Sequence, residues 1–167
     1  LFHRTDLPDN PVVPATVQAL TDGFHCTVLN WNDVQVRSVE HLLSACHGLG
    51  VDNLIVEIDS AEPPAAGGSG EQYAALLKKA GMVEQDAERD VLELEQVVTV
   101  AEDEASIVAM PADEGLSLTY LLDFDGEYGP AQAFSCRLDD AEFLDEIAPA
   151  RTWALEDDAS EFKKRSI

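Results

Sequence analysis

Apolar positions with a helical spacing occur twice in the first half of the chain. From Ser38 to Gly50, apolar residues stand at i, i+3, i+4 and i+7, which predicts a helix with Ser38 as its cap. A second stripe follows Ser69, and Ser69 with Gln72 three residues later is typical of a capping box. Gly81 should end this second helix, because glycine is favoured just past a helix C-terminus.

Alternating apolar and polar positions predict strands in both halves of the chain. A turn-rich tetrad, residues 30–33, should join the first two of them. A late helix should begin with a further capping box, Asp139 and Glu142, and direct Phe143 inward. The predicted strands are residues 27–29, 34–36, 53–59, 91–100, 106–110, 116–124 and 134–138.

A polar run without apolar periodicity, residues 84–90, separates two stretches that contain similar elements. Strands accompanied by helices on each side of this run predict an α+β protein. We therefore expect a first α+β domain at 1–83, a linker at 84–90 and a second α+β domain at 91–167.

Composition narrows the class of protein. The chain has 167 residues, of which 46% are hydrophobic, enough to bury a core. The formal net charge is −23, from 10 basic and 33 acidic side chains, which argues against nucleic acid as a partner. The sequence holds no apolar run of membrane-spanning length and no signal-like start, so we expect a cytoplasmic protein. The 3 cysteines are widely spaced, which predicts free thiols.

The start of the first predicted helix carries a carboxylate and an imidazole side by side. If the apolar stripe faces the core, His41 lies on nearly the opposite side, at about 100° per residue, and Glu40 lies on a flank. The partial positive charge of a helix N-terminus favours ionised Glu40 and neutral His41, the states that a general base and a metal-binding imidazole require. A plainer alternative is a solvated helix end.

The histidines do not form a metal motif by themselves. A catalytic zinc ion takes about three protein ligands, whereas the 4 histidines show no H-E-x-x-H or similar spacing. His47 lies about 240° around the helix from His41, so one regular helix cannot bring both to a single ion. Spacing and composition alone therefore leave the function open.

A long run of residues around Glu40 has a distinctive sequence. Residues 37–53 read R-S-V-E-H-L-L-S-A-C-H-G-L-G-V-D-N. This run resembles the signature of the UDP-3-O-acyl-N-acetylglucosamine deacetylase family of lipid A synthesis, in which a T-V-E-H-L helix precedes G-L-G-I-D-N. Further similar motifs, in the family's order, are Arg4-Thr5-Asp6-Leu7, Cys26-Thr27, Glu62-Pro63, Gly68-Ser69 and Ala150-Arg151-Thr152.

The resemblance implies a zinc-dependent deacetylase that acts on a UDP-linked acylated amino sugar. It implies that Glu40 is the general base, that His41 is a zinc ligand and that Thr152 helps to stabilise the oxyanion. Phe24 and Cys26 would belong to a strand edge near the substrate and its acyl chain. The implied fold has two similar α+β domains with helices sandwiched between their sheets and the active site between the domains.

Two departures from the family pattern affect these expectations. The family's other zinc ligands stand in an H-x-x-x-D helix after the A-R-T motif, and residues 153–167 contain no histidine. The family's M-D-G-S loop reads A-G-G-S at residues 66–69, without the carboxylate. We therefore expect a partial form of the enzyme that is inactive and metal-poor by itself. The alternative is a catalytically inactive, deacetylase-like binding or assembly module.

Overall fold

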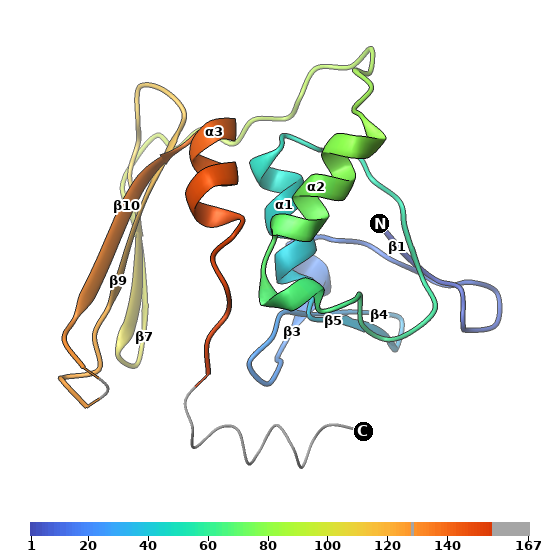
Figure 1. The fold of residues 1–167 in the computed structure, drawn as a ribbon, viewed down its shortest axis with the longest axis horizontal. Helices are drawn as coiled ribbons and strands as arrows, with labels where there is room; N and C mark the ends of the chain where they lie inside the picture. Colours follow the sequence, from blue (N-terminus) through green and yellow to red (C-terminus); the bar gives the residue numbers. More distant parts are fainter. Residues whose placement is uncertain (128, 155–167) are drawn as a thin grey trace. The chain divides into compact units, whose positions relative to one another are not determined.

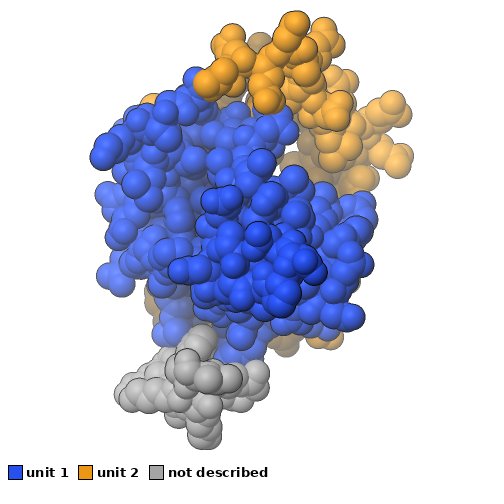
Figure 2. Space-filling model, turned by 90° about the vertical axis from the view of Figure 1, so that its right-hand side faces the viewer, with its two compact units in different colours: residues 1–82, 143–167 blue, residues 83–142 orange. Residues whose placement is uncertain are grey.

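A computed structural model describes residues 1–127 and 129–154. The chain divides into two compact units (Figure 2): unit 1 contains Leu1–Met82 and the described residues from Phe143 onward, and unit 2 contains Val83–Glu142. Helices and sheets are both present, which confirms the predicted α+β class. The domain boundaries predicted at 83/84 and 90/91, and the sandwiched helices, stay predictions.

The first sheet of unit 1 is built around the N-terminal strand. Strand β1 (Phe2–Arg4) lies between β2 (Val12–Val13), to which it is antiparallel, and β6 (Val56–Ile58), to which it is parallel. The N-terminal ammonium donates a hydrogen bond to the carbonyl of Leu54 at 2.9 Å. The sequence pattern predicts β6 within residues 53–59, but it does not predict β1 or β2.

The second sheet of unit 1 is a meander. Strand β4 (Val28–Trp31) pairs with β3 (Leu20–Thr21) on one side and with β5 (Val34–Arg37) on the other, both antiparallel. Asn32 and Asp33 have φ angles of 50° and 64°, the left-handed conformation that two-residue hairpin turns require. The predicted strands at 27–29 and 34–36 and the turn between them are confirmed.

Helices α1 (Glu40–Gly48) and α2 (Glu71–Ala80) pack side by side (Figure 1). Gly81, with a φ of 81°, ends α2 as predicted. Short 3-10 turns, η1 (Val17–Ala19) and η2 (Ala66–Gly68), precede β3 and α2.

The two predicted serine caps are wrong. Ser38 has a φ of 54°, whereas an N-cap residue normally has an extended backbone, and Val39 occupies the N-cap position of α1. Ser69 is buried and stands one residue ahead of Gly70, the N-cap residue of α2. Neither helix start has a hydrogen bond from a capping side chain.

The core of unit 1 joins both sheets to one face of α1. Val36 and Val39 are 0% exposed, and they lie on either side of the left-handed Ser38. Leu42 follows on the same helix face. The other buried members of this cluster are Phe2, Val13, Ala19, Leu29 and Ile58.

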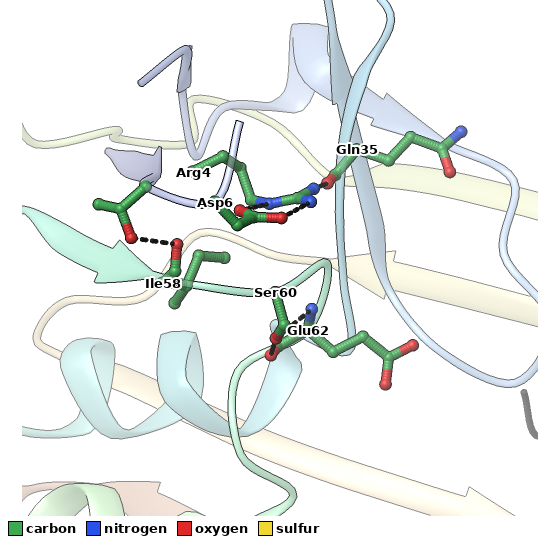
Figure 3. A network of polar contacts seen from close by, with 7 residues as sticks. Arg4, Asp6, Gln35, Ile58, Ser60 and Glu62 are labelled. Carbon is green, nitrogen blue, oxygen red and sulfur yellow. Dashed lines mark hydrogen bonds and ion pairs between the residues drawn. The ribbon is translucent and has the colours of Figure 1, made fainter. Parts of the chain in front are cut away.

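A buried arginine connects the two sheets (Figure 3). Arg4 is 7% exposed and makes a bidentate ion pair with Asp6, with Nε to Oδ1 at 2.8 Å and Nη2 to Oδ2 at 2.7 Å. Its Nη1 donates to the carbonyl oxygen of Gln35 in β5 at 2.7 Å. The bidentate pair with Asp6 fixes the orientation of the guanidinium group. The bond from this group to the Gln35 carbonyl then connects the end of β1 with β5.

Unit 2 consists mainly of two antiparallel hairpins. The first pairs β7 (Val98–Glu102) with β8 (Ala105–Ala109), and the second pairs β9 (Leu116–Leu122) with β10 (Gln132–Leu138). The predicted strands in this region are confirmed, except that the first begins at Val98 rather than at Val91. Among the described side chains of unit 2, Cys136 alone is buried.

The last helical segment crosses from unit 2 into unit 1. Helix α3 (Asp140–Glu142) continues as the π-helical turn η3 (Phe143–Ile147). Asp139 accepts a hydrogen bond from the backbone N–H of Glu142 at 2.9 Å, which confirms its predicted capping role. Phe143 is buried, also as predicted.

The Arg4–Asp6 pair should make the protein acid-sensitive. Hydrogen bonds from Arg4 lower the pKa of Asp6 below its usual value. The pair therefore contributes stability above the unfolded pKa of about 3.9, and this contribution is lost as the pH falls through the lower folded pKa. We expect the denaturant midpoint of the wild type to fall more steeply below about pH 4 than that of Asp6→Asn. The control Asp9→Asn removes a carboxylate from the same loop and should keep the wild-type slope; equal slopes for Asp6→Asn and the wild type would contradict the expectation.

Candidate active site

The candidate site is built around the start of α1, where Glu40 and His41 are the first two helical residues. Strand β5 ends at Arg37, and the left-handed Ser38 turns the chain so that Val39 enters the core. The backbone N–H of Arg37 donates to the carbonyl of Ala61 at 2.9 Å. Glu40 and His41 are both half-buried, so neither side chain is enclosed in the hydrophobic interior.

The Glu40 carboxylate is held by the loop that precedes β4. Its Oε2 accepts a hydrogen bond from the backbone N–H of Thr27 at 3.0 Å. A bond from a main-chain donor to a carboxylate is charge-assisted and fixes the orientation of the side chain. The contact connects two residues that are 13 positions apart and places Thr27, at the end of this loop, beside the helix start.

Phe24 and Cys26 lie in this loop rather than on a strand edge, which corrects the expected strand. Both side chains are half-buried, and the rings of Phe24 and His25 meet edge to face with centroids 4.4 Å apart. His25 has a φ of 51°. A Cβ on Gly23 would overlap the Cys26 carbonyl and the Val28 side chain, so the tightness of this turn opposes continuation of the strand.

The loop before α2 lies against the backbone of His41. A Cβ on Gly70 would lie 3.5 Å from the carbonyl oxygen of His41 and 3.8 Å from Cα of Ala148. His47, by contrast, is exposed in the last turn of α1, and His3 is in β1. The structure therefore brings His41 close to residues 70 and 148, whereas His47 lies at the other end of the helix.

Thr152 is attached to the same loop by its backbone. The N–H of Thr152 donates to the carbonyl of Gly68 at 2.8 Å, and Nε of Arg151 donates to the carbonyl of Gly67 at 3.0 Å. The Thr152 side chain is exposed. These bonds join segments that are 84 positions apart in the chain.

Buried contacts anchor the segment that leads to Thr152. Phe143 is 1% exposed and its ring covers Gly48 in α1, where a Cβ would overlap ring atoms. Ala148, further along the segment, is 2% exposed and lies against Gly70. The returning segment, residues 143–152, is thus held at Gly48, Gly70 and Gly68 in turn.

The described residues do not by themselves fit a catalytic zinc site. Within residues 1–127 and 129–154, no group of three His, Cys, Asp or Glu side chains could hold a metal ion. Only His41 is assigned as a ligand by the resemblance, and a catalytic zinc needs about three. Burial raises the pKa of the Cys46 thiol in α1, which makes it a poorer thiolate ligand.

The comparison with known families decides the classification. The family model for UDP-3-O-acyl N-acetylglycosamine deacetylase (LpxC) matches residues 1–167. The chain belongs to this deacetylase family. The resemblance inferred from residues 37–53 is therefore confirmed.

Individual relatives agree with the family match. The chain is 36% identical to UDP-3-O-acyl-N-acetylglucosamine deacetylase of Trichormus variabilis, over 92% of this chain and 56% of the relative. It is also 36% identical to the deacetylase of Stenotrophomonas maltophilia, over 100% of this chain and 55% of the relative. A bifunctional enzyme LpxC/FabZ of Chlorobaculum tepidum is 34% identical over 93% of this chain. The chain spans about 55% of the length of the deacetylases it matches.

Some residues that shape the site give little signal in the sequence. The donor to Glu40 is a main-chain N–H of Thr27, which no side-chain pattern reveals. Gly67 and Gly68 could have been noticed as consecutive glycines, but not as the acceptors for Arg151 and Thr152.

Among the described residues, no helix has both the length and the apolar character needed to span a bilayer.

Gly48→Ala should destabilise the protein, although glycine to alanine inside a helix is normally stabilising by about 0.5–1 kcal/mol. The added methyl group overlaps the Phe143 ring, and overpacking of a core costs about 1–3 kcal/mol. We expect a lower thermal midpoint in calorimetry, measured against Ser44→Ala, an exposed position on the same helix. A raised midpoint for Gly48→Ala would contradict the packing of Phe143 on α1.

Proposed function

We propose that the chain is part of a zinc-dependent deacetylase that removes the acetyl group from UDP-3-O-acyl-N-acetylglucosamine in lipid A synthesis. The observation that carries the proposal is the half-buried Glu40 carboxylate at the start of α1, oriented by the N–H of Thr27 and adjacent to His41. The family match and the names of the relatives support amide hydrolysis on this substrate. A UDP-linked substrate agrees with the cytoplasmic location expected from the sequence.

Glu40 is proposed as the general base. Its carboxylate accepts a proton from the water molecule that attacks the N-acetyl carbonyl carbon. The Thr27 N–H engages Oε2 and fixes the carboxylate plane, so the base does not need to be reoriented before proton transfer.

His41 is proposed as one zinc ligand of the complete protein. Together with further ligands of the complete protein, His41 would hold a zinc ion, which would supply Lewis-acid chemistry for the hydrolysis. Because the described residues supply only one of about three ligands, the other ligands belong elsewhere in the complete protein. The 167-residue chain is accordingly proposed to be inactive by itself.

Thr152 is proposed to donate its hydroxyl hydrogen to the oxyanion that develops on the N-acetyl oxygen. The residue is exposed while its backbone is bonded to Gly68, and both observations support this role. Phe24 and Cys26, beside the N–H donor of Glu40, are proposed to contact the substrate near its acyl chain.

The net charge of −23 opposes an anionic nucleotide diphosphate. Arg151 is exposed next to Thr152, and its Nε donates to the Gly67 carbonyl. We propose that Arg151 supplies local positive charge for the diphosphate, together with basic residues from the rest of the complete protein.

A deacetylase-like binding module without catalysis is the second candidate. The observation in its favour is the A-G-G-S loop at residues 66–69, which lacks the carboxylate of the family's M-D-G-S loop. The deacetylase is preferred because Glu40, His41 and Thr152 are all retained and their segments are connected through the loop that follows Ala65.

Replacement of the proposed base tests the mechanism. In the complete protein, Glu40→Gln keeps the shape of the side chain but removes the proton acceptor, so we expect kcat for deacetylation to fall by about 10²–10⁴. Glu71→Gln is the matched control, because Glu71 is also the first residue of a helix but is exposed on α2. Wild-type turnover of Glu40→Gln, with the fold intact by circular dichroism, would remove Glu40 from the mechanism.

Metal content tests the role of His41. The 167-residue chain, incubated with zinc and then desalted, should retain well below one zinc ion per molecule. In the complete protein, His41→Ala should reduce zinc content, whereas His47→Ala, a change at an exposed position of the same helix, should not. Tight stoichiometric zinc on the 167-residue chain would show that its ligand set is sufficient, or is shared between copies.

A further inference from the structure

Thr152 lies against Gly68 with both its backbone and its side chain. Its carbonyl accepts the Thr152 N–H at 2.8 Å, and a Cβ on Gly68 would lie 3.0 Å from the Thr152 Cγ2 methyl carbon. Apart from atoms of Gly68 itself and of its two chain neighbours, no other heavy atom of the described residues would come within 4 Å of that Cβ. The methyl group of Thr152 thus lies over the face of Gly68 where a side chain would stand.

The position of this methyl group determines where the Thr152 hydroxyl points. Threonine is branched at Cβ, so its methyl and hydroxyl groups occupy staggered positions about 120° apart and rotate together. A methyl group that moves away from Gly68 must carry the hydroxyl with it.

The loop that contains Gly68 also touches the other part of the candidate site. Two residues later, Gly70 lies against the carbonyl of His41, and the intervening Ser69 is 5% exposed. Gly68 has a φ of 74°, a conformation that glycine adopts without strain. The same loop therefore contacts Thr152 at Gly68 and the backbone of His41 at Gly70.

We propose that Gly68 is a positioning residue for Thr152: the missing side chain at position 68 makes room for the threonine methyl group and so sets the direction of its hydroxyl. The inference rests on the role proposed for Thr152 in stabilising the oxyanion. It adds that the glycine acts through packing and takes no part in the chemistry itself.

The neighbouring glycine provides a matched control. Gly67 has a φ of 76°, and a Cβ there would lie 3.6 Å from the end of the Gln72 side chain, an ordinary van der Waals distance. Gly67→Ala and Gly68→Ala therefore carry a similar backbone penalty, whereas only Gly68→Ala crowds Thr152. In the complete protein we expect Gly68→Ala to lower kcat about tenfold more than Gly67→Ala, with a similar KM, since small misplacements are costly in catalysis.

A second substitution relieves the crowding. Thr152→Ser removes the methyl group and keeps the hydroxyl, which is then no longer crowded but also no longer oriented by the methyl group. Gly68→Ala with Thr152→Ser should therefore recover part of the lost kcat and part of the lost thermal midpoint. Failure of Thr152→Ser to restore either quantity, or an equal kcat loss in both glycine variants, would overturn the inference.

Thr152→Val distinguishes the inference from the proposed function. It keeps the branched shape and removes the hydroxyl, so we expect kcat to fall while the thermal midpoint is retained. Wild-type turnover in Thr152→Val would refute the role of Thr152 and, with it, the catalytic part of the inference. The thermal recovery of the Gly68→Ala, Thr152→Ser double variant tests the packing contact independently of that result.

Discussion

The position of Glu40 depends on the burial of Val36 and Val39, which lie on either side of the left-handed turn at Ser38. Both valines are 0% exposed, so the chain cannot rotate at Ser38 without moving one of them toward solvent. Full burial of an aliphatic side chain contributes about 1.5–3 kcal/mol, enough to hold a single residue in the left-handed conformation. The start of α1, and with it the Glu40 carboxylate and the His41 imidazole, follows from this constraint.

The sequence predicted elements whose pattern is repeated over several residues. The stripe of α1, the β4–β5 hairpin and the strands of unit 2 were found because each places several apolar side chains in register. Strands β2 and β3 have two residues each, too few to show alternation. The caps at Ser38 and Ser69 were predicted wrongly because tertiary packing determines the backbone there, and an isolated serine carries no signal of that packing.

Unit 2 shows that alternation predicts a strand but not its partner. Tyr120 and Leu121 are neighbours in β9, so their side chains point to opposite faces, yet they are 64% and 67% exposed. The described part of this unit therefore lacks the apolar contacts that make the core of unit 1.

Conversely, Arg4 stands in a polar segment that suggests a surface position. It is buried because Asp6 and the Gln35 carbonyl satisfy its guanidinium.

The candidate site could be predicted in its side chains but not in its connections. Glu40 and His41 are indicated by the helical spacing and by the family resemblance, and Thr152 by the resemblance alone. The bonds that orient their segments use main-chain groups of Thr27 and Gly68. A main-chain donor or acceptor is present whatever the side chain. Such a hydrogen bond therefore does not require a particular residue at its position, and any such requirement must come from another interaction. At Gly68 the proposed demand is space for the Thr152 methyl group, and at Glu40 it is the carboxylate of the proposed general base. Under the proposed roles, the residues that must keep their identity are those whose side chains take part in the chemistry and Gly68, whose lack of a side chain makes room for Thr152.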